Sequence, residues 1–170
     1  MKIRLTAVFL IVSAACALFS DGTFAKPRGR ILVLGFRSSQ LNDVQDRLLR
    51  ETVMRRLHTE GFQIVPVMEI ESVFSEDRKG RIRKLSRDDV RKICADLVAG
   101  YALFGSISPM DGRQDGGIAE GRSYDCSLVL YRKDDNRFTE VKLTLAGGKN
   151  LYEFYNALSE RGVSEIVMLL

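Results

Sequence analysis

The stretch that decides the fold begins at residue 94 and reads Cys94-Ala95-Asp96-Leu97-Val98-Ala99-Gly100-Tyr101-Ala102-Leu103-Phe104-Gly105-Ser106-Ile107-Ser108. Its first part is typical of the end of a helix, and Gly100 is a stop signal. The apolar run that follows predicts a buried strand. Because a helix that leads directly into a buried strand is a building unit of α/β domains, the stretch predicts that class of fold. It contains no pattern that indicates catalysis.

Strand and helix signals also alternate upstream of this stretch. The run Arg30-Ile31-Leu32-Val33-Leu34-Gly35-Phe36 predicts a strand that is buried on both faces. A helix is expected over residues 42–60 and a second strand over residues 62–67, where Pro66 indicates a sheet edge or a strand end. One or two further helical turns are expected over residues 68–74.

Capping residues mark where two of the helices begin. Asn42 or Asp43 is placed to cap the helix over residues 42–60. Ser86, with Asp89 three residues later, has the spacing of a capping box and predicts the start of the helix that ends near Gly100.

A hairpin and a final helix are expected downstream. The predicted elements are a strand over 101–108, a loop over 109–117, strands over 119–132 and 138–145 joined by a turn over 133–136, and a helix over 151–170 that Gly162 kinks or splits. The predicted order is β-α-β-α-β-β-β-α, which corresponds to a single α/β domain with a mixed sheet and packed helices.

The N-terminal residues have the layout of a secretory signal peptide. A basic head (residues 1–4) precedes an apolar run (residues 5–19), and Thr23-Phe24-Ala25 is a suitable cleavage site. We expect residues 1–25 to be removed and residues 26–170 to form the domain in the periplasm. The alternatives are cleavage near Ser20, a retained anchor helix, and a lipid anchor on Cys16.

The composition is that of an ordinary soluble globular domain. The 170 residues carry a formal net charge of +4, with 45% hydrophobic and 28% charged residues. A small charge of this kind concerns solubility and does not predict a nucleic-acid partner. Once the leader has left, Cys94 and Cys126 remain, and they form either a disulfide or two buried thiols.

Two segments are candidates for binding. Arg37, Ser38 and Ser39 follow a strand and precede a helix, where a loop is able to hold an anion on helix N–H groups. The other candidate is a basic segment near the middle of the chain that offers a surface for a partner protein, an anionic membrane or a cell-wall polymer. Its cationic residues are Arg78, Lys79, Arg81, Arg83 and Lys84.

Recognisable catalytic, cofactor and metal motifs are absent from the sequence. Cys94 and Cys126 do not have metal-ligand spacing, and the loop after Phe36 lacks the glycines of a dinucleotide site and the lysine of a P-loop. His58, the only histidine, has no nucleophile or ligand partner in register and is expected at the surface. We therefore expect a protein that is not an enzyme and holds no cofactor.

Three segments resemble the TolB N-terminal-like superfamily, which includes CsgG-type and LpoB-type periplasmic domains. They are Ile31-Leu32-Val33-Leu34-Gly35-Phe36, residues 93–107, and Ser127-Leu128-Val129-Leu130-Tyr131. The matches follow one another in order over most of the chain after the leader. The turn over residues 133–136 departs from the pattern because it lacks the usual glycine, and no clear lipobox precedes Cys16.

The resemblance implies a non-enzymatic module that binds other proteins of the cell envelope, with no catalytic residues to carry over. A small-ligand or anion binder that uses the loop at residues 37–39 is the alternative, and a hydrolase with an unrecognised site is a third. Charge reversal at Arg81 and Arg83 is expected to weaken partner binding without unfolding the domain. Exposed strand edges near residues 63–67 and 138–145 are further docking candidates.

Overall fold

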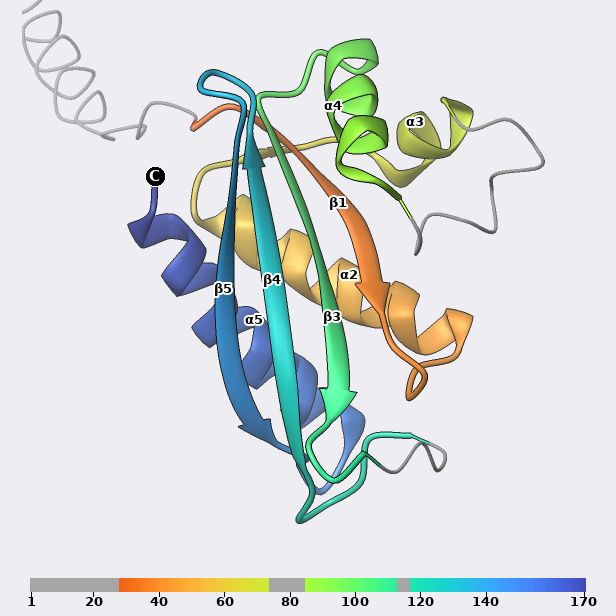
Figure 1. Ribbon diagram of the computed structural model, residues 1–170. Helices are drawn as coiled ribbons and strands as arrows, with labels where there is room; N and C mark the ends of the chain where they lie inside the picture. Colours follow the sequence, from red (N-terminus) through yellow and green to blue (C-terminus); the bar gives the residue numbers. More distant parts are fainter. Residues whose placement is uncertain (1–27, 74–84, 113–116) are drawn as a thin grey trace, which may run out of the picture.

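The computed structural model describes residues 28–73, 85–112 and 117–170 (Figure 1). Its elements are β1 (Arg30–Arg37), α2 (Asp43–Thr59), β2 (Gln63–Ile64), α3 (Val67–Ser72), α4 (Arg87–Asp96), β3 (Tyr101–Pro109), β4 (Ser123–Arg132), β5 (Arg137–Ala146) and α5 (Leu151–Met168). This succession confirms the predicted order and the mixed α/β fold, and α3 corresponds to the turns expected over residues 68–74.

The strands form one five-stranded mixed sheet in the order β2-β1-β3-β4-β5. Strand β1 runs parallel to both β2 and β3, whereas β3, β4 and β5 are successively antiparallel. The two edges therefore differ greatly, because β2 is two residues long and β5 is ten.

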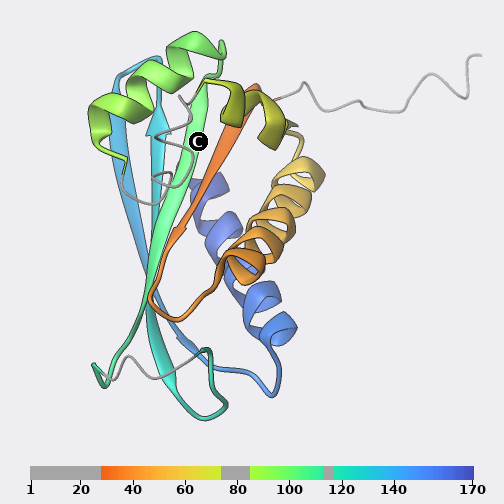
Figure 2. The ribbon, with the colours of Figure 1, turned by 90° about the vertical axis from the view of Figure 1, so that its right-hand side faces the viewer.

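Helices cover the two faces of the sheet unequally. Helices α2 and α5 lie against one face (Figures 1 and 2). Helix α4 lies on the opposite face, at the end of the sheet where β3 begins (Figure 2). Helix α3 buries Ile70 in the same apolar cluster as α4. Within the described part of the chain, no helix covers the rest of this second face.

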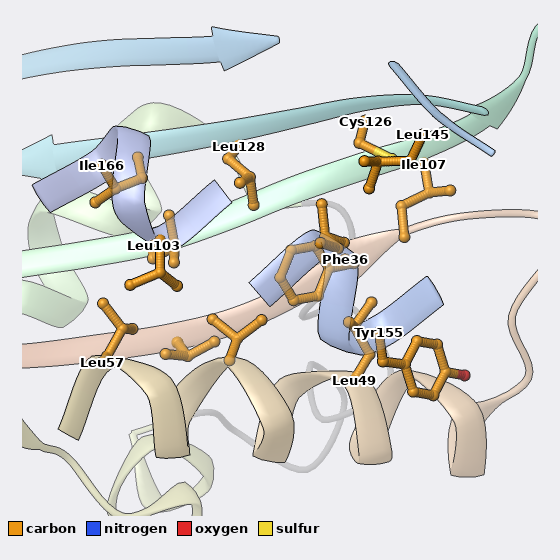
Figure 3. Packing of buried hydrophobic residues seen from close by; sticks show 14 of the residues in the cluster. Phe36, Leu49, Leu57, Leu103, Ile107, Cys126, Leu128, Leu145, Tyr155 and Ile166 are labelled. Atoms are coloured by element: carbon orange, nitrogen blue, oxygen red, sulfur yellow. The ribbon is translucent and has the colours of Figure 1, made fainter. Parts of the chain in front are cut away.

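Most of the core lies between the sheet and the α2–α5 layer. Figure 3 shows Phe36 from β1, Leu49 from α2 and Tyr155 from α5 meeting there. Phe36 follows a bulge in β1 at Gly35, whose φ of 112° favours glycine. The Phe36 N–H donates a hydrogen bond to Oδ1 of Asp46 at 3.0 Å, which ties the end of β1 to helix α2.

The predicted helix caps are present. Asn42 accepts a hydrogen bond from the N–H of Gln45, whose side chain in turn accepts from the N–H of Asn42. Ser86 and Asp89 form the same reciprocal arrangement at the start of α4. Each cap satisfies N–H groups that the first helical turn leaves without an intrahelical partner.

The end of α4 differs from the prediction. The helix stops at Asp96, and Val98 rather than Gly100 takes the left-handed conformation, with a φ of 49°. The Ala99 N–H donates to the carbonyl of Cys94 and the Val98 N–H to that of Ala95, which is a Schellman motif. Gly100 serves the sheet instead, because its N–H donates to the carbonyl of Arg30.

Two further expectations need correction. Strand β2 is shorter than residues 62–67, because Pro66 lacks an N–H for the sheet and stands at the start of α3. Gly162 does not split α5, which is continuous from Leu151 to Met168. A Cβ at Gly162 would collide with Cδ1 of Leu128, so this glycine lets α5 approach β4 closely.

The disulfide alternative is also corrected. Cys94 and Cys126 are both free and buried. They belong to different apolar clusters, Cys94 to the one beneath α4 and Cys126 to the one beneath α2 and α5. The sheet therefore separates the two thiols, and the buried-thiol alternative is the one the structure contains.

Candidate binding groove on the open face of the sheet

The sheet face that carries α4 is polar where the helix does not reach. Successive side chains of a strand point to opposite faces of the sheet. Alternate residues of β3, β4 and β5 therefore point toward this side, whereas their neighbours enter the α2–α5 core. We call this surface the open face. Its polar residues are Ser106, Ser108, Asp125, Ser127, Glu140, Lys142 and Thr144.

A hollow of about 330 Å³ lies where the open face meets the start of α4. Arg37 and Arg87 contribute cations to its wall, and Phe104, Phe138 and Val129 contribute apolar surface. The other lining residues are Leu85, Gly105, Ser106, Ser127 and Glu140. The hollow thus combines positive charge with an apolar floor.

A second hollow, of about 450 Å³, continues along the same face. It shares Ser106, Ser127 and Glu140 with the first, so the two form one groove across β3, β4 and β5. Its character is more polar, because Asp125, Lys142 and further hydroxyl groups line it. We call the two hollows together the open-face groove.

Contacts from α4 and β1 fix the cationic end of the groove. The guanidinium groups of Arg87 and Arg91 each lie 5.1 Å from the centre of the Phe138 ring, within cation–π range. Arg37 donates a hydrogen bond from Nη2 to the carbonyl of Leu85 at 3.0 Å. Arg87 itself is exposed, so its charge is available to a partner.

Hydrogen bonds across the strands organise the polar end. Ser127 donates from Oγ to Oε1 of Glu140 at 2.6 Å, and Thr144 donates to Oδ1 of Asp125 at 3.3 Å. Lys142 Nζ lies 4.0 Å from Oε2 of Glu140. The acidic groups thus have neighbours, while both hydrogen bonds remain on the exposed surface.

In the part of the chain that the structure describes, the thiols and the single histidine lie apart from one another. Burial raises the pKa of Cys94 to about 12 and that of Cys126 to about 12, so neither thiol is an activated nucleophile at neutral pH. His58 is exposed, as expected, and Nδ1 lies 3.4 Å from the carbonyl oxygen of Phe62. Among residues 28–73, 85–112 and 117–170, no group of three or more acidic, histidine or cysteine residues is arranged to hold a metal.

Two backbone donors that flank the loop at residues 37–39 bind the chain's own polar groups. The Phe36 N–H binds Asp46, and the Gln40 N–H donates to Oγ of Ser38 at 3.0 Å. Asn42 caps the first turn of α2. These two donors are therefore engaged within the chain, and the anion-binding role of the loop stays a prediction.

Of the other predicted candidates, several lie outside the described residues, whereas the edge at residues 138–145 lines the groove. Arg78, Lys79, Arg81, Arg83 and Lys84 lie outside the described residues, as do the leader and Cys16. Of the two predicted edges, the one at residues 138–145 is a full strand. None of the described helices is both long enough and apolar enough to cross a membrane.

Sequence reasoning missed the groove, although part of its signal was present. In β4 and β5, polar Asp125, Ser127, Glu140 and Lys142 alternate with buried residues, which indicates a sheet with one solvated face. Arg37 was a candidate only as part of the loop at residues 37–39, and no local signal connected it with Arg87. These residues are fifty positions apart in the sequence, and only the folded arrangement brings them to one hollow.

Solved structures share this architecture. The LpoB C-terminal domain from Salmonella enterica has 16% sequence identity and a TM-score of 0.51, with 78% of this chain and 91% of that chain covered. Lipoprotein GNA1162 from Neisseria meningitidis has 12% identity and a TM-score of 0.52, with 81% and 95% covered. No protein-family model and no curated protein matches the chain. At these identities the likeness concerns the fold alone: the chain has an LpoB-like fold, as its resemblance in sequence implied.

Proposed function

We propose that this protein is a non-enzymatic binding module of the bacterial cell envelope and that the open-face groove receives a segment of a partner protein. The observation that carries the proposal is the first hollow, in which two arginines border an apolar floor. Interfaces are enriched in arginine and aromatic residues. The polar half of the groove supplies hydroxyl groups for a polypeptide backbone.

The lining predicts the chemistry of the partner segment. An apolar side chain fits against Val129 and the two phenylalanines, and a neighbouring carboxylate fits the guanidinium of Arg87. A carboxylate also accepts two parallel hydrogen bonds from a guanidinium, which fixes the orientation of the two groups relative to each other. We therefore expect a segment in which an acidic residue lies next to an apolar one.

The envelope location rests on the leader and on the fold. We propose that residues 1–25 direct export and are removed, so that residues 26–170 work in the periplasm; a lipid on Cys16 is the alternative. The two solved structures described above are consistent with this proposal, since one is described as a lipoprotein and the other is a domain of LpoB. The anion-binding alternative finds no support in the loop at residues 37–39.

The test compares two substitutions in the groove with one outside it. Arg87→Glu reverses the charge at the first position of α4, where an acidic residue suits the helix dipole, so stability is retained. Val129→Arg fills the hollow. Lys92→Glu makes the same charge change on the same helix at an exposed residue that does not line the groove.

The expected result is a partner retained by the wild-type chain and by Lys92→Glu but lost by Arg87→Glu and Val129→Arg. Capture from envelope extract followed by mass spectrometry identifies it, and binding of the purified partner is expected to weaken at least about tenfold in the two groove variants. Identical sets of captured proteins for all four chains would refute the groove as the docking surface. Circular dichroism of each variant shows that the fold is kept.

A further inference from the structure

Within the described residues, strand β5 has no strand partner along one side of its backbone. It is the last strand of the sheet and pairs only with β4. The Gly147 N–H donates to the carbonyl of Arg122, and the Met110 N–H to that of Ser123. Even-numbered residues of β4 therefore bond toward β5 and odd-numbered ones toward β3, since the pattern alternates along an antiparallel ladder.

The register then identifies the outward residues of β5. Odd-numbered residues such as Val141, which is opposite Leu128, bond toward β4. The outward residues are Phe138, Glu140, Lys142, Thr144 and Ala146. Among the described residues, none donates or accepts a hydrogen bond with the outward N–H and C=O groups of these five. They extend over about 27 Å at 3.4 Å per residue.

We propose that a second copy of this chain pairs with this edge, antiparallel and with the two-fold axis at Val141. Outward residues of one copy then face outward residues of the other. With the axis at Val141, Glu140 of each copy lies opposite Lys142 of the other. Their side chains stand on the open face, where Lys142 is well exposed.

The charges select this register over its neighbours. An axis at residue 140 would place Glu140 opposite its own copy, and an axis at residue 142 would do the same for Lys142. Like charges directly opposite each other destabilise an antiparallel pair, whereas opposite charges stabilise it. Axes at residues 139 or 143 pair each charge with an uncharged residue. Only the axis at Val141 joins opposite charges, and it does so twice.

This pairing would also cover a long free strand edge. Natural proteins shorten or cover long free edges, because such edges recruit other strands. The β2 edge is short, but β5 is ten residues long and carries one lysine in its centre. A paired β5 would join two sheets into one and would leave the arginine end of the groove in each copy unobstructed. The inference therefore does not depend on the proposed function.

The register is tested by disulfide trapping in the full chain carrying Cys16→Ser. Two residues on the axis form a non-hydrogen-bonded pair with Cα atoms about 4.5 Å apart, which a disulfide can span. Val141→Cys is expected to give a covalent dimer on mild oxidation, seen by non-reducing electrophoresis. Thr139→Cys is the control, because residue 139 faces residue 143 of the other copy. Cross-linking of Thr139→Cys but not Val141→Cys would overturn the proposed register.

Charge exchange tests the same contact without new cysteines. Glu140→Lys and Lys142→Glu are each expected to weaken self-association about tenfold or more in analytical ultracentrifugation, and the double variant is expected to restore it. Ser108→Lys adds a charge to the same face on β3, two strands away from the edge, and should leave association unchanged. A wild-type chain that stays monomeric at every concentration, or association insensitive to Glu140→Lys, would overturn the proposal.

Discussion

Val98 is held in a backbone conformation that a β-branched residue rarely adopts. Its φ is 49°, and its side chain is 71% exposed, so packing contributes little in return. The left-handed conformation costs an ordinary residue about 1–2 kcal/mol, and glycine avoids that cost. The backbone of Val98 is therefore strained, because the turn between α4 and β3 requires the left-handed conformation there.

Replacing Val98 with glycine is expected to stabilise the protein by about 1 kcal/mol, after allowance for the greater freedom of glycine in the unfolded chain. Urea denaturation measures the change. Val44→Gly is the matched control, because Val44 is equally exposed but lies in the first turn of α2. There the same substitution should destabilise by about 0.5 kcal/mol. Equal effects at both sites would contradict the account of strain.

The buried thiols predict a loss of stability at high pH. Burial raises the pKa of each thiol from 9.0 to about 12 in the folded protein. As the pH rises, the unfolded chain therefore loses these protons before the folded chain does. The contribution of the protonated thiols to the free energy of unfolding is fully present below pH 9 and is lost as the pH rises toward 12. The slope is up to about 1.4 kcal/mol per pH unit for each thiol.

Denaturation curves at pH 8, 9 and 10 test this expectation. A variant with Cys94→Ala and Cys126→Ala starts from lower stability but should lose less of it between pH 9 and 10. Burial also raises the pKa of Tyr155 to about 12. Its contribution to the pH dependence becomes important only near and above its ordinary pKa of 10.0, where the unfolded chain loses the phenol proton and the folded chain keeps it. Parallel curves for the variant and the wild-type chain would show that the thiols do not carry the effect.

At the scale of elements, Gly162 sets the distance between α5 and the sheet. A glycine inside a helix usually costs about 1 kcal/mol relative to alanine. Here a Cβ would collide with Leu128, so Gly162→Ala is expected to destabilise by about 1–2 kcal/mol despite its better helix propensity. Thermal unfolding measures the sign. A stabilised Gly162→Ala variant would show that the contact with β4 is looser than the structure has it.

A double-mutant cycle isolates the contact. Leu128→Ala alone removes a core side chain and should cost about 2–5 kcal/mol. In the background of that substitution, Gly162→Ala no longer meets the leucine and is expected to become neutral or stabilising. Additive effects would contradict the proposed packing.

The element order could be predicted because its signals are local. The caps at Asn42 and Ser86 and the apolar strand runs depend on residues close together in sequence. The left-handed Val98 could not be predicted, because valine carries no preference for that conformation and Gly100 offered a stronger signal nearby. The role of Gly162 in α5 could not be predicted either, because the side chain that a Cβ would meet belongs to Leu128, thirty-four residues away.

At the scale of the whole molecule, the unequal covering of the sheet creates the candidate site. Helices α2 and α5 bury one face, and α4 reaches only part of the other (Figure 2). The open-face groove lies on the part of the second face that α4 leaves uncovered. Its lining comes from β1, α4, β3, β4 and β5, so no single segment of sequence contains its pattern. That is why sequence analysis could predict the fold but not the groove.

The central claim is that a partner protein binds in the open-face groove, and the most direct test is a dissociation constant. Once the comparison of groove variants has identified a partner, calorimetry with the purified proteins measures its affinity for the wild-type chain, Val129→Arg and Lys92→Glu. The account predicts unchanged affinity for Lys92→Glu and binding at least about tenfold weaker for a folded Val129→Arg. Equal affinity for all three chains would contradict it.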